Sequence, residues 1–388
     1  MLLQIKANKP DILLCCSSAP HFGLLKHMTI WACSMRKIGL NITVVSGPNE
    51  QEKGLFDTLK LEDIPFFIVK NIDGRFPYRL YRTIPQLKKI LTLIRPEIIH
   101  VMGIGHGVDL FLSSRKLSLN PKLICTLESC RHGTFYEGFA YRTGAKLVNY
   151  MFNFLVTISE SDRSKMLTAE VRPEKLMYIP NFIDCNAFLE KINRYKNSPE
   201  ISKYLKEKRP RIIYLAQLIK RKGHIYLFKA LKIILNRYPD TLLLLCGMGE
   251  YERGVRKEAK KMGLNDSVHF LGQIPHDYIP AILSHCDISV VSSLSETFGW
   301  AIVEPLLAGI PVVSTRVGIA PELEKAGGLI GVPTADSEAL AHGILQLLED
   351  FELRQRIVEI GSKYVKDHAD INIVTKEYIK LYNSLSLR

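Results

Sequence analysis

The chain has 388 residues, of which 47% are hydrophobic and 23% are charged, and its formal net charge is +13. These proportions are typical of a soluble globular protein and exclude a disordered or low-complexity chain. The length favours two domains of similar size.

The eight cysteines have no Cys-x-x-Cys spacing, and most stand in apolar runs, which is typical of core thiols in a reducing compartment. The opening MLLQIKANKPDILLCC lacks the order of segments that defines a signal peptide, and no apolar run approaches the length of a membrane span. The sequence therefore predicts a cytoplasmic protein that at most lies peripherally on the cytoplasmic membrane.

Short apolar, β-branched runs alternate with segments of helical length along the chain. Runs that are apolar throughout are typical of strands buried on both faces of a parallel sheet. In the first half we predict strands at 11–17, 41–47, 64–70, 97–103, 122–128, 154–159 and 176–180. In the second half we predict strands at 211–218, 241–247, 268–272, 287–293, 310–315 and 328–333.

The excess of positive charge lies mainly in the first half, where the stretch RFPYRLYRTIPQLKK at 75–89 mixes basic and aromatic residues. Such a stretch suits an anionic membrane surface. It equally fits a solvated surface helix with snorkelling arginines. No zinc finger, ribonucleoprotein motif or basic tail accompanies the charge, so nucleic acid is not an expected partner.

The polar, Lys-rich stretch at 191–211 interrupts the alternation and is the best candidate for a linker. The fold class predicted is α/β, with two doubly wound parallel-sheet domains. In open parallel sheets ligands bind outside the carboxyl ends of the strands. Two such sheets facing each other would place these ends on either side of one central cleft.

The stretch CDISVVSSLSETFGWAIVEPLLAG at 286–309 predicts a strand, a loop and a helix. Glu296 precedes the helix and Glu304 stands inside it, so the two are separated by about 12 Å along the axis. This exceeds the roughly 5–10 Å between the paired carboxylates of glycosidases. The glutamates are therefore expected to bind two ends of an elongated ligand, and the Gly299 and Trp300 amides between them suit phosphate. The alternative is that neither glutamate binds a ligand: Glu296 would be a charge that suits the helix dipole, and Glu304 an ordinary helix residue.

This pattern, Glu-x7-Glu around Phe-Gly-Trp, resembles the retaining family-4 glycosyltransferases of the GT-B architecture (glycosyl transferases group 1). Asn181 and Asp184 resemble the hinge motif of that family. The similarity extends through 286–323, 242–252, 264–275 and 178–188.

The resemblance implies two Rossmann-like domains. Residues 1–185 would bind the acceptor, with the C-terminal helix at 371–388 packing back on them, and residues 186–370 would bind a nucleotide-sugar donor. The implied reaction is retaining transfer of the sugar to an acceptor hydroxyl. The acceptor would belong to a lipid-linked saccharide, a cell-surface polysaccharide or a glycolipid.

The resemblance also implies roles for single residues in donor binding. Glu296 would contact the transferred sugar beside the anomeric carbon, and Glu304 would accept hydrogen bonds from the ribose hydroxyls. The other implied donor-binding residues are Gly247, Gly249, Ile274, Thr297, Phe298, Gly299 and Trp300.

A basic group has to stabilise the leaving diphosphate as negative charge grows on it. The family supplies an Arg in a Gly-Arg-Leu triplet and a Lys five residues later. Here Lys222 matches the Lys and is expected to be catalytic with Glu296, but Gln217 stands at the Arg position. Arg221 or Lys220 could replace the missing charge. Gln217, Arg221 and Lys222 are candidate donor-binding residues, a solvated basic turn is the alternative for Arg221 and Lys220, and this alternative is favoured for Lys220.

In the first domain, Gly23 is the candidate for close approach to the donor phosphates. Glu128 stands where the family has a sugar-binding His, and His132 follows four residues later. Either of them is a candidate for contacts with the sugar, and His106 is a further candidate at the acceptor side.

No Asp-x-Asp pair follows a strand and no residues have the spacing of metal ligands, so neither a metal nor a cofactor is expected. Two further functions stay open. One is a catalytically silent nucleotide-sugar-binding partner, which Gln217 and Glu128 suggest. The other is a nucleotide-sugar epimerase of the same fold.

Overall fold

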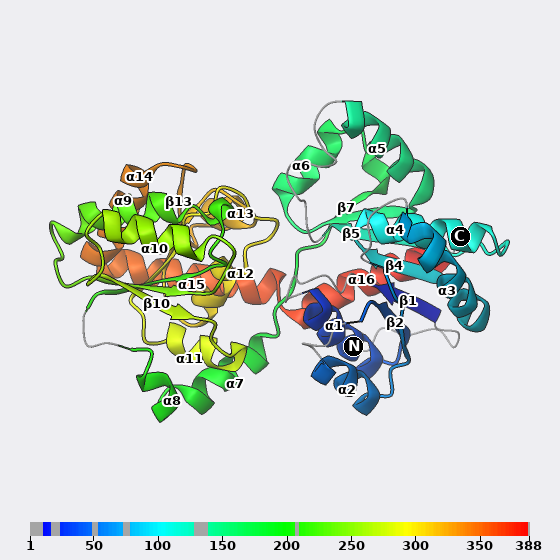
Figure 1. Cartoon of the computed structure of the whole chain (residues 1–388), viewed down its shortest axis with the longest axis horizontal. Helices are drawn as coiled ribbons and strands as arrows, with labels where there is room; N and C mark the ends of the chain where they lie inside the picture. The colour runs from blue at the N-terminus through cyan, green and yellow to red at the C-terminus, as the bar shows by residue number, and fades with distance from the viewer. Residues whose placement is uncertain are drawn as a thin grey trace. The chain divides into compact units, whose positions relative to one another are not determined.

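The computed structural model describes residues 11–16, 24–48, 53–72, 78–127, 139–205 and 209–386. The chain divides into two compact units. The first unit comprises Met1–Pro180 and Ile371–Arg388, and the second comprises Asn181–Asp370. Each unit contains one parallel β-sheet (Figure 1).

The first unit contains a seven-stranded parallel sheet in the order β3-β2-β1-β4-β5-β6-β7. Its strands are β1 (Asp11–Cys15), β2 (Asn41–Ser46), β3 (Phe66–Ile68), β4 (Ile98–Met102), β5 (Lys122–Leu127), β6 (Phe154–Thr157) and β7 (Leu176–Tyr178). Most of their side chains are buried, because helices cover the sheet. The helices are α1 (Leu24–Lys37), α2 (Lys53–Leu61), α3 (Tyr78–Ile94), α4 (Ile104–Arg115), α5 (Phe139–Met151), α6 (Glu160–Thr168) and α16 (Ile371–Ser386), with the 3-10 turn η2 (Pro173–Lys175).

Helix α16 joins the first unit although it comes from the end of the chain, and Figure 1 shows it, in red, near α1. Its Tyr382 hydroxyl lies 2.7 Å from His100 Nδ1, and both side chains are fully buried. Burial lowers the pKa of His100 to about 3. The ring is therefore neutral at physiological pH and can form hydrogen bonds without a buried charge.

The second unit contains a six-stranded parallel sheet in the order β10-β9-β8-β11-β12-β13. Its strands are β8 (Arg211–Leu215), β9 (Leu242–Cys246), β10 (Val268–Gly272), β11 (Ile288–Val291), β12 (Val312–Thr315) and β13 (Ile330–Val332). Its helices are α7 (Cys185–Tyr195), α8 (Pro199–Ser202), α9 (His224–Leu235), α10 (Glu252–Lys261), α11 (Ile279–Leu283), α12 (Trp300–Leu307), α13 (Ala320–Ala326), α14 (Ser337–Glu349) and α15 (Phe351–His368), with the 3-10 turns η3 (Lys220–Lys222) and η4 (His276–Tyr278).

The predicted linker at 191–211 is wrong, because this stretch lies inside the second unit. Its first residues end helix α7, which buries Cys185 and Phe188. Lys191 of this helix pairs with Asp277 at 2.8 Å. Residues Pro199–Ser202 of the stretch form α8, which buries Ile201. The polar, Lys-rich composition thus belongs to surface segments that pack on the second unit, not to a linker between the units.

The predicted fold class is confirmed, since each predicted apolar run contains one strand of the two parallel sheets. Short apolar runs were a reliable signal because both faces of these sheets are covered. Among the described helices, none has both the length and the apolar character that crossing a membrane requires.

Candidate active site

The site lies where the strand order of the second sheet reverses, between β8 and β11. These strands pair in parallel, with Ile213 opposite Ser289, so the loops that follow them leave the same edge of the sheet. A glycine brings the loops together. Gly223 has a φ of 66°, and a β-carbon there would lie 2.1 Å from the backbone oxygen of Ser292. Such a reversal point is the usual ligand site of open α/β sheets.

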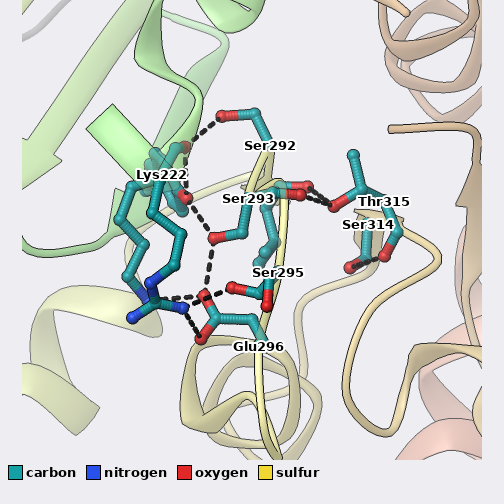
Figure 2. A network of polar contacts seen from close by, with 10 residues as sticks. Lys222, Ser292, Ser293, Ser295, Glu296, Ser314 and Thr315 are labelled. Atoms are coloured by element: carbon teal, nitrogen blue, oxygen red, sulfur yellow. Dashed lines mark hydrogen bonds and ion pairs between the residues drawn. The ribbon is translucent and has the colours of Figure 1, made fainter. Parts of the chain in front are cut away.

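Lys222 and Glu296 form an ion pair at this point. Lys222 is the last residue of η3, and Glu296 lies in the loop after β11. The distance between Lys222 Nζ and Glu296 Oε1 is 2.5 Å. The two side chains are only 13% and 11% exposed. Ser293 Oγ donates a second hydrogen bond of 2.5 Å to the same carboxylate oxygen, as Figure 2 shows. The structure therefore brings together the two residues that the sequence predicted to be catalytic.

The electrostatics of this pair favour an ionised carboxylate. Burial alone raises the pKa of Glu296, but Lys222, Ser293 and Arg221 together more than offset this effect. The pKa of Glu296 therefore lies below its usual value of 4.5. At neutral pH the side chain is an anion, so it has no proton to donate as a general acid.

Arg221 adds a second cation to the site. Its guanidinium donates to the backbone oxygen of Ser295 and lies 3.4 Å from Glu296 Oε2. Lys220 instead lies over the ring of Tyr251, with 5.3 Å between Nζ and the ring centroid. Gln217 is exposed and carries no charge. Of the two candidates for the missing charge, Arg221 is the one that contacts Glu296.

Helix α12 carries the second glutamate. Glu304 is largely buried, and its Oε1 lies 3.6 Å from Nε2 of His276 in η4. The helix begins after Gly299, whose φ is 101° and which has no side chain to cap the first turn. A helix start of this kind suits an anion. Phe298 is buried, Thr297 and Trp300 are half-buried, and the rings of Phe298 and Trp300 pack at 5.4 Å.

The loops after β9 and β10 hold the other predicted donor-binding residues. Gly247 follows β9, and a β-carbon there would lie 2.1 Å from the backbone oxygen of Ala216, so the loops after β8 and β9 are in close contact. Gly249 lines a cavity of about 480 Å³ at the start of α10, together with Glu250, Glu252, Arg253 and Arg256. Ile274, after β10, is buried.

The first-unit candidates remain predictions. His106 is a buried residue in the first turn of α4. Gly23, Glu128 and His132 lie outside the described residues.

Three residues near the predicted ones were not found from the sequence: Tyr214, Ser293 and His276. Tyr214 stands in the apolar strand RIIYL, where a tyrosine is an ordinary core residue. Ser293 is an uncharged residue after a strand, and nothing in the sequence distinguishes it from other serines. His276 is a single loop histidine, and such a residue gives no specific signal. In the part of the chain that the structure describes, no group of three or more His, Cys, Asp or Glu side chains could hold a metal ion.

Two family models match the chain. The model for Glycosyltransferase Family 4 matches residues 23–187, and the model for Glycosyl transferases group 1 matches residues 196–364. Together they cover most of both units. The chain belongs to the family-4 glycosyltransferases of the GT-B architecture.

Individual relatives agree with this family. An uncharacterised glycosyltransferase of Methanocaldococcus jannaschii is 26% identical over 305 residues, which cover 76% of this chain and 70% of the relative. The GPI3 subunit of the phosphatidylinositol N-acetylglucosaminyltransferase of Saccharomyces cerevisiae is 22% identical over 97% of this chain and 87% of its own. The Anabaena protein HepE, solved with UDP and glucose, has a TM-score of 0.79 at 20% identity, covering 97% of this chain and all of HepE. At 20% identity, the similarity to HepE is evidence for a shared fold alone.

Proposed function

We propose that this glycosyltransferase moves a sugar from a nucleotide diphosphate sugar to an acceptor hydroxyl, with retention at the anomeric carbon and without a metal ion. The observation that carries the proposal is the contact between Lys222 and Glu296 at the point where the strand order reverses. When a glycosidic bond breaks, positive charge grows on the anomeric carbon and negative charge grows on the leaving diphosphate. An adjacent carboxylate and ammonium match this polarity.

Each charge then has a distinct role. The Glu296 carboxylate would stabilise the sugar beside the anomeric carbon, because its low pKa keeps it ionised. Lys222 and Arg221 would stabilise the leaving phosphate in place of a metal ion. With Glu296 ionised and paired with cations, the departing phosphate itself would accept the proton of the attacking hydroxyl on the same face of the sugar.

Donor binding would use the rest of the second unit. HepE, which has the same fold, was solved with UDP and glucose, and this supports a nucleotide-sugar as the donor. Glu304 would accept hydrogen bonds from the ribose hydroxyls, and the start of α12 at Gly299 would bind phosphate. The loops that carry Gly247 and Ile274 would flank the base.

The acceptor would be presented at an anionic membrane surface. Helix α3 contains no acidic residue and exposes Tyr81 and Leu93 at 83% and 73%, beside the exposed Arg82 and Lys89. Such a helix suits the interface of an anionic bilayer. The yeast relative, named for transfer to phosphatidylinositol, supports a lipid acceptor.

A donor panel tests the reaction. UDP-glucose, UDP-N-acetylglucosamine, GDP-mannose and ADP-glucose are incubated with the protein, and nucleotide release is measured with and without EDTA. We expect release from at least one donor that EDTA leaves unchanged and that Glu296→Ala abolishes, and NMR of the product should show the anomeric configuration of the donor. Binding without release would indicate a silent partner, and conversion of the donor sugar without release would indicate an epimerase.

Vesicle sedimentation tests the membrane surface. The wild type should sediment with vesicles that contain phosphatidylserine and not with phosphatidylcholine alone, and binding should weaken as salt rises. Arg82→Glu/Lys89→Glu should lose this binding. The matched control Lys257→Glu/Lys260→Glu changes the charge equally at exposed positions of α10 and should keep it. Equal loss in both variants would refute a specific role for α3.

A further inference from the structure

Behind the ion pair lies a buried tyrosine hydroxyl that the proposed mechanism does not use. Tyr214 is on β8 and is 1% exposed. Its Oη lies 2.8 Å from the backbone oxygen of Lys222 and 2.8 Å from Ser293 Oγ. The hydroxyl thus contacts the backbone that carries the Lys222 ammonium and the side chain that donates to the Glu296 carboxylate.

The chemistry of the donors and acceptors fixes the direction of each hydrogen bond. An ionised carboxylate only accepts hydrogen bonds, so the hydroxyl of Ser293 donates its single hydrogen bond to Glu296. The oxygen of Ser293 can then accept a hydrogen bond from the Tyr214 hydroxyl. Burial, followed by the negative charge of Glu296, raises the pKa of Tyr214 well above its usual value, so the phenol keeps its proton and remains a donor. The phenol hydroxyl has two acceptors within hydrogen-bond distance, Ser293 Oγ and the backbone oxygen of Lys222.

We propose that Tyr214 is a positioning residue that aligns Lys222 with Glu296 for glycosyl transfer. This inference rests on the proposed function. The hydroxyl holds two segments that are far apart in the sequence, η3 after β8 and the loop after β11, at the point where their charged groups meet. A misplacement of about 1 Å between reacting groups can lower a rate about 100-fold.

Removing only the hydroxyl isolates this role. In Tyr214→Phe the backbone oxygen of Lys222 still accepts from Ser292 Oγ at 3.0 Å, and Ser293 still donates to Glu296. The ring is kept beside His224, at 5.4 Å between the ring centroids. The variant should therefore fold, because no buried donor loses its only partner.

Kinetics measure the expected effect, with the donor of the panel that the wild type turns over fastest. We expect kcat of Tyr214→Phe to fall about tenfold and KM for the donor to stay within about twofold, as for a group that orients the reacting charges. The charged groups that face Glu296 are Lys222 and Arg221. They remain, but a less constrained Ser293 hydrogen bond lets the pKa of Glu296 rise. The acidic limb of the pH profile should therefore move to higher pH.

The control is Tyr382→Phe in the first unit, which removes another fully buried hydroxyl with a hydrogen bond of 2.7 Å. It should lower the melting temperature and leave kcat and the pH profile unchanged. A double-mutant cycle with Ser293→Ala should be non-additive, because both changes break the same chain of hydrogen bonds.

The outcomes separate this inference from the proposed function. No turnover by the wild type, or full turnover by Glu296→Ala, contradicts the proposed function. A Tyr214→Phe variant with the kcat and pH profile of an active wild type overturns only the positioning role. Failure of Tyr214→Phe to fold also overturns it, since the hydroxyl would then act on stability.

Discussion

Replacing Lys222 with methionine is expected to destabilise the second unit, because it leaves the carboxylate of Glu296 buried without its main partner. The side chain of Glu296 is 11% exposed and accepts from Lys222 and Ser293 at 2.5 Å each. Removing one partner of a buried ion pair costs about 3–5 kcal/mol. Because Arg221 and Ser293 remain, we expect about 2–3 kcal/mol, which would lower the melting temperature by about 5–10 °C for a unit of this size.

The penalty should depend on pH in a defined direction. Without Lys222, burial dominates and the pKa of Glu296 rises above that of the unfolded chain. A carboxyl with a raised pKa in the folded state destabilises the fold where it is ionised, and protonation relieves the effect. The difference in melting temperature between wild type and Lys222→Met should therefore shrink as the pH falls from 8 to 5.

The double variant Lys222→Met/Glu296→Gln provides the control. It contains no unpaired buried charge, because Arg221, which loses its carboxylate partner, is 41% exposed and still donates to the backbone oxygen of Ser295. The oxygen of the introduced amide can still accept from Ser293, so the stability should return to within about 1 kcal/mol of the wild type. Scanning calorimetry of the full chain measures all three proteins. If the double variant melts as low as Lys222→Met at pH 8, the buried charge is not the cause and the reasoning is refuted.

Three further variants test other parts of the site. Arg221→Gln should lower nucleotide release about tenfold or more, and adding Gln217→Arg should restore part of it, because both positions would supply charge to the leaving diphosphate; absence of any rescue in steady-state assays would count against this shared role. Glu304→Gln should raise KM for the donor about tenfold with little change in kcat, as expected for uniform binding of hydroxyls; an equal loss in kcat would contradict that role. Gly223→Ala should destabilise the second unit by more than about 2 kcal/mol, because its φ of 66° and the contact with Ser292 exclude a β-carbon; an unchanged melting temperature would show that the loop can shift.

The sequence predicted the fold well because its signals are local. An apolar run such as LLLLC in β9 is long enough for one strand, too short for a helix, and buried on both faces. The prediction of a linker at 191–211 was wrong because surface segments with mostly exposed polar side chains have the composition of a linker. The apolar residues that anchor them are few: Cys185 and Phe188 of α7 lie just before the stretch, and Ile201 of α8 is buried inside it.

The site was predictable only in part, because its contacts join distant segments. Lys222 and Glu296 were each identified by motif, yet no local signal indicates that residues 74 apart form an ion pair. The sequence favoured Arg221 over Lys220 but could not establish its contact with Glu296, since the direction of each side chain depends on the turn η3. Tyr214 could not be identified, because a tyrosine in an apolar strand has the pattern of a core residue. The hydrogen-bond partners of its hydroxyl come from two other segments, η3 and the loop after β11.

The most direct test of the central claim separates binding from chemistry in Glu296→Gln. Calorimetric titration with the nucleoside diphosphate of the preferred donor should give a Kd within about threefold of the wild type, because the carboxylate would act on the sugar rather than on the nucleotide. Release of that nucleotide from the donor should fall by at least about 100-fold, as for the loss of a group that stabilises transition-state charge. Turnover within about twofold of the wild type would contradict the assignment of the Lys222–Glu296 pair as the catalytic centre.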